Sequence, residues 1–163
     1  MEVNAHEIDF IRWTLGVNTY DRITRVYASG GRYLQEHSDY ADLVFLTVTL
    51  SNGATGFLHA GQVSANGGYG GSVDCEKASI HFPNIWGENS AIEIRTFDAH
   101  TETILAKDIP IKPPVQAEIQ AFIEAILDKK PVPVTGIDGR AATEIALAAY
   151  ESINSGMAIP LPL

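Results

Sequence analysis

Residues 42–63, DLVFLTVTLSNGATGFLHAGQV, predict two antiparallel strands joined by a tight turn. In residues 42–50 every second side chain is apolar, which places these side chains on one face of a strand. They are Val44, Leu46, Val48 and Leu50. The turn Ser51-Asn52-Gly53-Ala54 contains Asn-Gly, the strongest short-range signal for a hairpin. We therefore expect residues 55–63 to pair with residues 42–50.

The opposite face of this hairpin is apolar as well. It carries Leu43 and Phe45 on the first strand. On the second strand it carries either Phe57 and His59 or Leu58 and Ala60, depending on the register. A monomer would expose this apolar surface, so we expect a partner sheet or subunit to cover it.

Further strands and a helix are expected around the hairpin. Strand patterns occupy residues 22–28, 73–82, 91–97 and 102–106. The residues before Gly16 predict a helix with two apolar stripes, so we expect it to be buried on both sides. The stripes are Ile8, Ile11 and Leu15 on one side, and His6, Phe10 and Trp13 on the other.

The C-terminal third predicts two more helices. An apolar stripe with helical spacing runs from Val115 to Ile126. The last helix is expected to begin at Asp138 as N-cap and to end at Gly156. This order of elements predicts one α+β domain over residues 1–163, with an open, mostly antiparallel sheet and helices on one face. The other face would be available for oligomerisation.

The composition excludes several classes of partner. The chain has 163 residues, a formal net charge of −9 at pH 7 and 45% apolar residues. A surface this acidic repels phosphate backbones and anionic lipids, so we expect neither a nucleic acid nor a membrane partner. The only cysteine, Cys75, is compatible with a cytoplasmic protein, and we expect no signal peptide.

Among the side chains that could take part in catalysis, His6 is the main candidate. The five histidines are scattered without metal-ligand spacing, and the glycines of residues 67–71 precede a predicted strand, which does not match a dinucleotide-binding fingerprint. We expect Cys75 to be a small core residue. His6 lies in the first turn of a helix, whose dipole keeps the imidazole neutral, as a general base requires. Glu2 could orient it or relay the proton; alternatively, His6 simply packs beside the neighbouring aromatic side chains.

Several segments of the chain follow one another in a specific order. The first is the acid-x-x-x-His-x-x-Asp pattern of residues 2–9, followed by Arg-Trp and Gly16. Residues 41–61 and Tyr69-Gly70-Gly71-Ser72-Val73-Asp74 come next. Residues 131–139 and the alanine-rich helix before Gly156 come last. Together these segments resemble the C-terminal domain of the Gfo/Idh/MocA oxidoreductases, NAD(P)-dependent enzymes of sugars, inositols and related polyols.

The resemblance implies roles for individual residues. His6, aided by Glu2, would serve in proton transfer beside the substrate hydroxyl and the nicotinamide. Tyr69 would approach the substrate, and Asp9 would be structural. The open sheet face would form the interface of a homo-oligomer.

Nothing in this sequence matches the Rossmann domain of that family, its glycine-rich loop or its Glu-Lys-Pro motif. We therefore expect NAD or NADP in a longer parent dehydrogenase, and no cofactor on this chain, which would be inactive by itself. The alternative is a non-enzymatic dimerisation or small-ligand-binding module that retains the fold.

Overall fold

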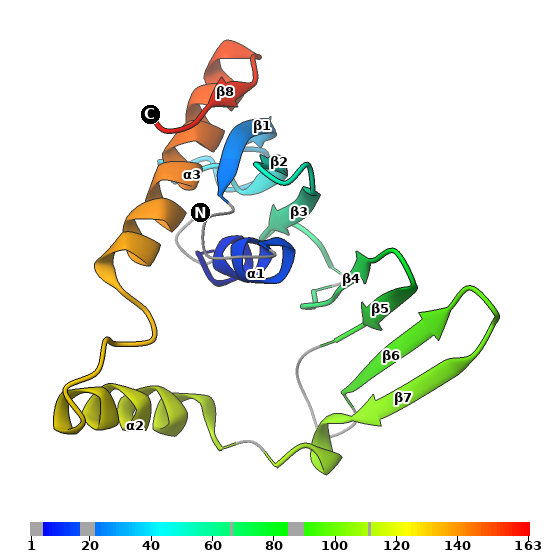
Figure 1. The fold of residues 1–163 in the computed structure, drawn as a ribbon. Helices are drawn as coiled ribbons and strands as arrows, with labels where there is room; N and C mark the ends of the chain where they lie inside the picture. The colour runs from blue at the N-terminus through cyan, green and yellow to red at the C-terminus, as the bar shows by residue number, and fades with distance from the viewer. Residues whose placement is uncertain (1–4, 17–21, 66, 85–89, 111) are drawn as a thin grey trace. The chain divides into compact units, whose positions relative to one another are not determined.

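The computed structural model describes residues 5–16, 22–65, 67–84, 90–110 and 112–163 (Figure 1). They fall into two compact units: unit 1, Met1–Ala65 with Val134–Leu163, and unit 2, Asn66–Pro133. The predicted α+β class is confirmed, with the strands distributed over two antiparallel sheets. The expectation of a single domain over residues 1–163 stays a prediction.

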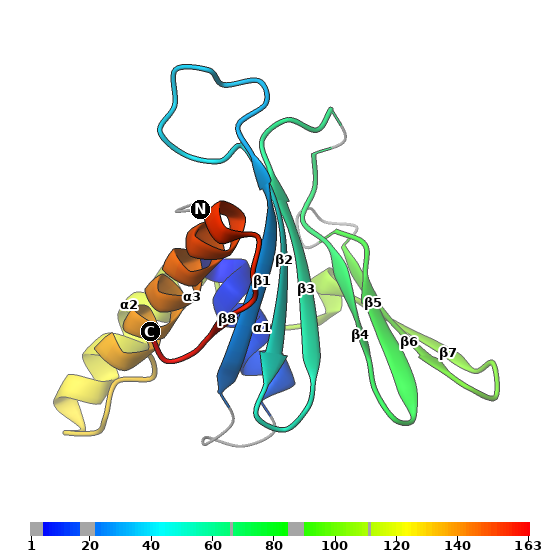
Figure 2. The same ribbon diagram turned by 90° about the horizontal axis from the view of Figure 1, so that it is seen from above.

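Unit 1 is a four-stranded antiparallel sheet in the order β3-β2-β1-β8, with two helices on one face. Its elements are α1 (Ala5–Leu15), β1 (Ile23–Gly31), β2 (Leu43–Leu50), β3 (Thr55–Gly61), α3 (Gly136–Ser155) and β8 (Ile159–Pro160). Figure 2 shows α1 and α3 on the same side of the sheet.

The hairpin predicted from residues 42–63 forms as expected. The backbone N–H of Leu50 donates to the carbonyl of Ala54 at 2.9 Å, and Gly53 takes a φ of +88°, which favours glycine. Phe45 lies opposite His59 in the register of β2 and β3. The register therefore decides between the two alternatives, with His59 and Phe57 on the outer face and Ala60 in the core.

The core of unit 1 lies between this sheet and the two helices. Every inward side chain of β2 is at most 2% exposed, and Val26 of β1 is fully buried. Ala148 and Ala149 of α3 are also fully buried against the sheet. Their small side chains let the α3 backbone pack directly against β1.

Unit 2 contains the second sheet, in the order β4-β5-β6-β7. Its elements are β4 (Gly71–Asp74), β5 (Ala78–Phe82), β6 (Ala91–Thr96), β7 (Thr101–Leu105), the 3₁₀ turn η2 (Ala106–Asp108) and α2 (Pro114–Leu127). In the described part of α2 only Ala125 is buried. The apolar stripe from Val115 to Ile126 is exposed.

The single strand predicted over residues 73–82 is wrong, because the chain turns within it. The backbone N–H of Cys75 donates to the carbonyl of Ala78 at 2.9 Å and closes a turn between β4 and β5. The charged pair Glu76 and Lys77 occupies this turn, where both side chains reach solvent. Cys75 is exposed, so its predicted place in the core is wrong as well.

Candidate active site

Helix α1 is anchored to the sheet through one side only. Ile8 is 2% exposed, and Ile11 and Leu15 pack against the same core. The helix comes close to β3 because Gly56 has no side chain: a Cβ there would lie 2.7 Å from Cγ2 of Ile11. The first predicted stripe of this helix therefore faces the core as expected.

The second predicted stripe of α1 is exposed, which corrects the expectation of burial on both sides. His6 is exposed, Phe10 is 42% exposed and Trp13 is 78% exposed. The rings of Phe10 and Trp13 lie 6.3 Å apart at an angle of 45°. Within unit 1, α1 packs mainly against β3 and α3. Unit 1 thus holds one imidazole and two aromatic rings together on an accessible helix surface.

An ion-pair network ties α1 to the first turn of α3. Arg12 contacts the carboxylate of Asp9, and its Nη2 lies 3.4 Å from Oδ1 of Asp138. Oδ2 of Asp138 accepts hydrogen bonds at 2.8 Å from both the backbone N–H and the hydroxyl of Thr135. These two bonds, together with Arg12, hold the pKa of Asp138 below its ordinary value.

The N-cap of α3 is Thr135, which corrects the expectation that Asp138 caps this helix. Asp138 is the third helical residue, and its carboxylate reaches back to the N-cap as in a capping box. The sequence contains this Thr-x-x-Asp spacing, but the prediction placed the N-cap at the Asp, one helical turn too late.

His6 occupies the second position of α1, within its first turn. Backbone N–H groups without a partner in the helix gather at such an end. Glu2, the predicted helper, lies outside the described residues. The catalytic roles of both residues stay predictions.

Tyr69, the predicted substrate contact, belongs to unit 2 and is half-buried just before β4. The neighbouring Gly70 is needed because a Cβ there would lie 2.3 Å from the carbonyl oxygen of Pro83. This glycine serves a close backbone approach, and the segment leads into a strand rather than a helix. The structure describes Tyr69 and His6 in separate units.

The outer face of sheet β3-β2-β1 carries an aromatic cluster, which we call the sheet-face patch. It consists of Tyr27, Phe45, Phe57 and His59, all exposed. The ring of Phe45 stacks on His59 at 4.8 Å and on Phe57 at 6.3 Å, with interplanar angles of 19° and 18°. The sequence indicated an apolar outer face, but it did not reveal that a titratable ring lies inside the cluster.

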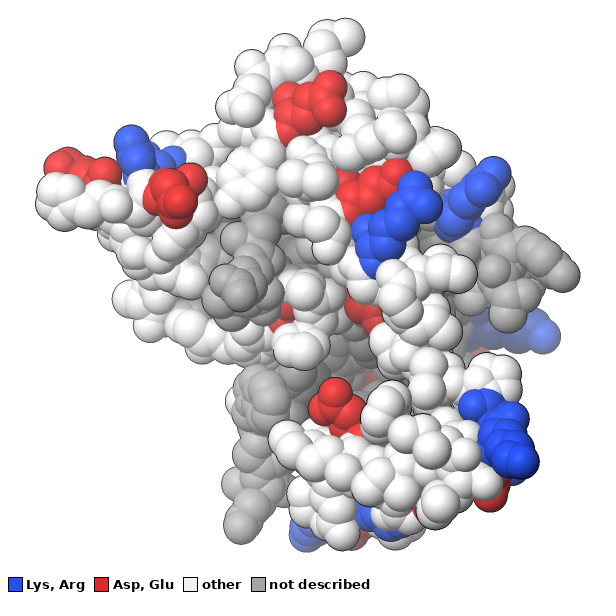
Figure 3. Space-filling view, turned by 90° about the vertical axis from the view of Figure 1, so that its left-hand side faces the viewer, with Lys and Arg blue, Asp and Glu red and all other residues white. Residues whose placement is uncertain are grey.

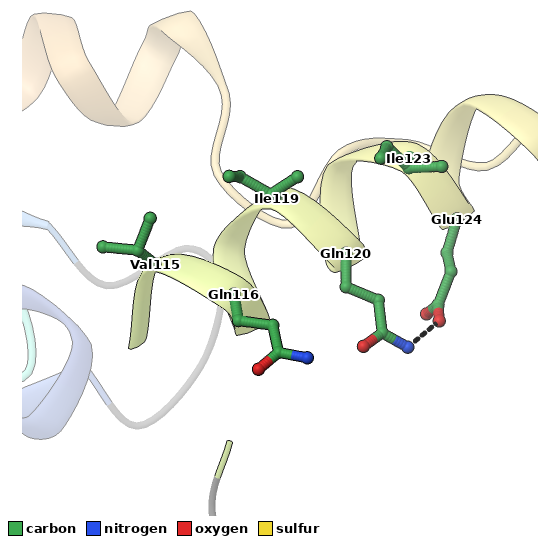
Figure 4. Close-up of a pocket in the computed structure, with 6 residues that line it drawn as sticks. All are labelled: Val115, Gln116, Ile119, Gln120, Ile123 and Glu124. Carbon is green, nitrogen blue, oxygen red and sulfur yellow. Dashed lines mark hydrogen bonds between the residues drawn. The ribbon is translucent and has the colours of Figure 1, made fainter. Parts of the chain in front are cut away.

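Other surfaces carry no predicted site residue. Among the described residues, no group of three or more His, Cys, Asp or Glu side chains is placed to hold a metal ion. A shallow depression is lined by α2 alone, with Val115, Ile119 and Ile123 along one side of the helix (Figure 4). On the face drawn in Figure 3, acidic and basic side chains lie scattered among uncharged ones. No described helix is both long and apolar enough to cross a membrane.

Comparison with known sequences identifies a family. Residues 1–81 match the family model described as GFO/IDH/MocA C-terminal domain. An uncharacterized oxidoreductase of Bacillus subtilis (strain 168), YrbE, is 29% identical over 174 residues. That alignment covers 99% of this chain and 47% of the relative, so the chain spans about half the length of this protein.

Solved structures share the fold. The aldose-aldose oxidoreductase from Caulobacter crescentus, complexed with glycerol, matches 97% of this chain and 46% of its own, with a TM-score of 0.82 and 16% identity. The WlbA dehydrogenase from Bordetella pertussis, in complex with NADH and UDP-GlcNAcA, matches 99% of this chain and 44% of its own. Its TM-score is 0.71 and its identity is 18%.

Proposed function

The chain is a C-terminal domain of the Gfo/Idh/MocA family of oxidoreductases, and we propose that it is the substrate-binding and oligomerisation part of an NAD(P)-dependent dehydrogenase. Its substrate would be a sugar, an inositol or a related polyol, oxidised at a CH–OH group. The proposal places the enzyme in the cytoplasm, where the exposed thiol of Cys75 would stay reduced.

The observation that carries this proposal is the two-sided character of α1. Its inner stripe is fixed in the core by Ile8, while its outer stripe presents His6 beside two exposed aromatic rings. Small-molecule sites combine apolar or aromatic walls with a few placed polar groups. A rigid helix that presents such a set to the outside is suited to form one wall of a substrate site.

In this site His6 would exchange a proton with the hydroxyl group of the substrate. A neutral imidazole can accept that proton as the alcohol is oxidised and return it in the reverse direction. Glu2, four residues earlier, would orient the imidazole or relay the proton. Tyr69 would contact the substrate through its phenol group.

The described glycine-rich segment before β4 does not fit a dinucleotide. It runs into strand β4, whereas a pyrophosphate is bound where a glycine turn opens a helix. We therefore assign NAD or NADP to a part of the protein outside this chain. Two findings support this assignment. This chain covers 47% of YrbE, and the WlbA dehydrogenase was solved in complex with NADH.

The substrate class is supported by the relatives with the same fold. One of them is an aldose-aldose oxidoreductase complexed with glycerol, and another is complexed with UDP-GlcNAcA. The exposed rings of Phe10 and Trp13 would contact the C–H groups of such a polyol, while His6 contacts a hydroxyl.

The sheet-face patch would join two copies of the chain. Aromatic side chains are enriched in protein interfaces, and an exposed apolar cluster on a monomer marks such a site. The chain carries a net charge of −9, so two copies repel each other except through a surface without acids. The outward positions of β1, β2 and β3 include no Asp or Glu.

The first experiment compares a His6→Ala variant with the unchanged protein in the complete oxidoreductase. We expect the turnover of a polyol to fall by about 10²–10⁴-fold, as removal of a general base does, with little change in nicotinamide affinity. His37→Ala is the matched control, because His37 is also exposed but lies on the β1–β2 loop. Comparable losses of turnover and nicotinamide affinity would contradict the role.

A second experiment separates the enzyme from the non-enzymatic module. Sugars and polyols are titrated into the 163-residue chain while the fluorescence of its two tryptophans, Trp13 and Trp86, is followed. Binding that is weakened by His6→Ala supports the proposed site. Saturable binding that is unaffected by this change would favour a ligand-binding module without catalysis.

A further inference from the structure

The sheet-face patch contains a single group that changes charge near neutral pH, the imidazole of His59. Histidine is the side chain that gains a positive charge between about pH 8 and pH 5. His59 is exposed on β3, and its ring stacks on Phe45 at a centroid distance of 4.8 Å. Phe57, two residues earlier on the same face, also stacks on Phe45, at a centroid distance of 6.3 Å.

Among the described residues of unit 1, the side chains of β2 and β3 around His59 are uncharged. Strand β2 is the neighbour of β3 and presents Leu43, Phe45 and Thr47 to this side of the sheet. On its own strand, the outward neighbours of His59 are Phe57 and Gly61. Two titratable or charged side chains of β1 share this face, Tyr27 and Arg25, and neither can neutralise an imidazolium.

Resting on the proposed oligomer, we propose that His59 makes the association of two copies depend on pH. When a second copy covers the patch, the imidazole leaves water and lies among aromatic rings. Burial without an acidic partner disfavours the charged form of a histidine. The proton therefore binds to the free chain in preference to the oligomer, and a falling pH shifts the equilibrium toward separate chains.

The expected effect is large because each interface of two copies buries two imidazoles. If burial lowers the proton affinity of one imidazole tenfold, protonation of that imidazole weakens association about tenfold. We therefore expect the dissociation constant to rise by at least about tenfold between pH 7.5 and pH 5.5.

The test measures the dissociation constant of the 163-residue chain by sedimentation equilibrium at pH 7.5 and pH 5.5. His59→Gln keeps a polar side chain of similar reach without the charge, and its association should be nearly independent of pH. His100→Gln is the matched control, because His100 is exposed but is not one of the residues of the patch, and it should behave as the unchanged chain. Circular dichroism at both pH values checks that each variant is folded.

The outcomes separate the inference from the proposed function. An unchanged chain that associates at pH 7.5 and dissociates at pH 5.5, with the effect abolished in His59→Gln alone, supports the assignment. Equal association at both pH values, or a His59→Gln variant that keeps the pH dependence, overturns the role of His59 and leaves the oligomer intact. A chain that is monomeric at both pH values overturns the proposed oligomer and the inference with it.

Discussion

The hydroxyl group of Ser152 on α3 accepts a hydrogen bond from the backbone N–H of Ala28 on β1, at 2.8 Å. It also donates to the carbonyl of Met157, at 2.6 Å. Strand β8 pairs with β1 only at Arg25 and Val26, so Ala28 lies beyond the end of this ladder. The hydroxyl of Ser152, which is fully buried, thus continues the hydrogen bonding of β1 where the partner strand is missing.

Replacement of Ser152 by Ala should destabilise unit 1. The change leaves the buried N–H of Ala28 and the carbonyl of Met157 without their partner, which costs about 1–3 kcal/mol of unfolding free energy. Urea denaturation followed by circular dichroism measures this loss. Ser155→Ala is the control, because the hydroxyl of Ser155 is exposed and bonds to its own helix; an equal loss in both variants would refute the bridging role.

Replacement of Gly56 by Ala should disturb the packing of α1 against β3. The added Cβ would lie 2.7 Å from Cγ2 of Ile11 and 3.2 Å from Cδ1 of Leu15, so the helix must shift away from β3. Overpacking of this kind costs about 1–3 kcal/mol. Gly139→Ala on α3 is the contrasting variant, because nothing lies within 4 Å of its Cβ. A Gly56→Ala variant that is as stable as the unchanged chain, or more stable, would contradict this packing.

The sequence predicted those parts of the fold in which a local pattern decides the structure. The period of two in residues 42–50 and the Asn-Gly turn lead to the observed hairpin, and the stripe of Ile8 and Leu15 leads to the buried side of α1. The strand over residues 73–82 was wrong because apolar residues on both sides masked the charged turn at Glu76 and Lys77.

For the candidate site, the sequence predicted which residues to consider but not their surroundings. His6 and Trp13 formed a stripe that looks like a core face, because periodicity does not distinguish a buried face from one that awaits a ligand or partner. The stack of Phe45 on His59 depends on the pairing of two strands, and the sequence alone left that register open.

The carboxylate of Asp42 should make the β1–β2 loop sensitive to acid. Burial raises the pKa of Asp42, but hydrogen bonds from the backbone N–H groups of Gln35, Leu34 and Tyr33 outweigh it and lower the pKa below its ordinary value. The stability that these bonds provide is present above the ordinary aspartate pKa, near 3.9, and is lost as the pH falls through the lowered value.

Asp42→Asn should therefore be less stable than the unchanged chain at pH 7, with a difference that shrinks below about pH 4. Denaturation midpoints between pH 7 and pH 3 measure it. Asp39→Asn is the matched control, because Asp39 is exposed in the same loop. A stability difference for Asp42→Asn that stays constant over this range would show that the charge of Asp42 does not hold the loop.

Removal of the Asp138 carboxylate should loosen α1 and α3 together. This group accepts two hydrogen bonds from Thr135 at the start of α3 and pairs with Arg12 of α1. Asp138 is the acidic member of the capping box, an element that contributes about 0.3–1.5 kcal/mol, so Asp138→Ala should lower the unfolding free energy by that amount. Asp128→Ala, which removes an exposed acid after α2, should change it by less than about 0.5 kcal/mol.

The network also predicts that Arg12 and Asp138 act through each other. In a double-mutant cycle, Arg12→Gln should cost less in the Asp138→Ala background than alone, because its partner on α3 is already gone. Trp13 is the neighbour of Arg12 on α1, and a change of its fluorescence in Asp138→Ala, while the chain remains folded, would report a moved helix. Additive costs and unchanged fluorescence would mean that the pair does not position α1, and the placement of His6 would then depend on the packing of Ile8, Ile11 and Leu15 alone.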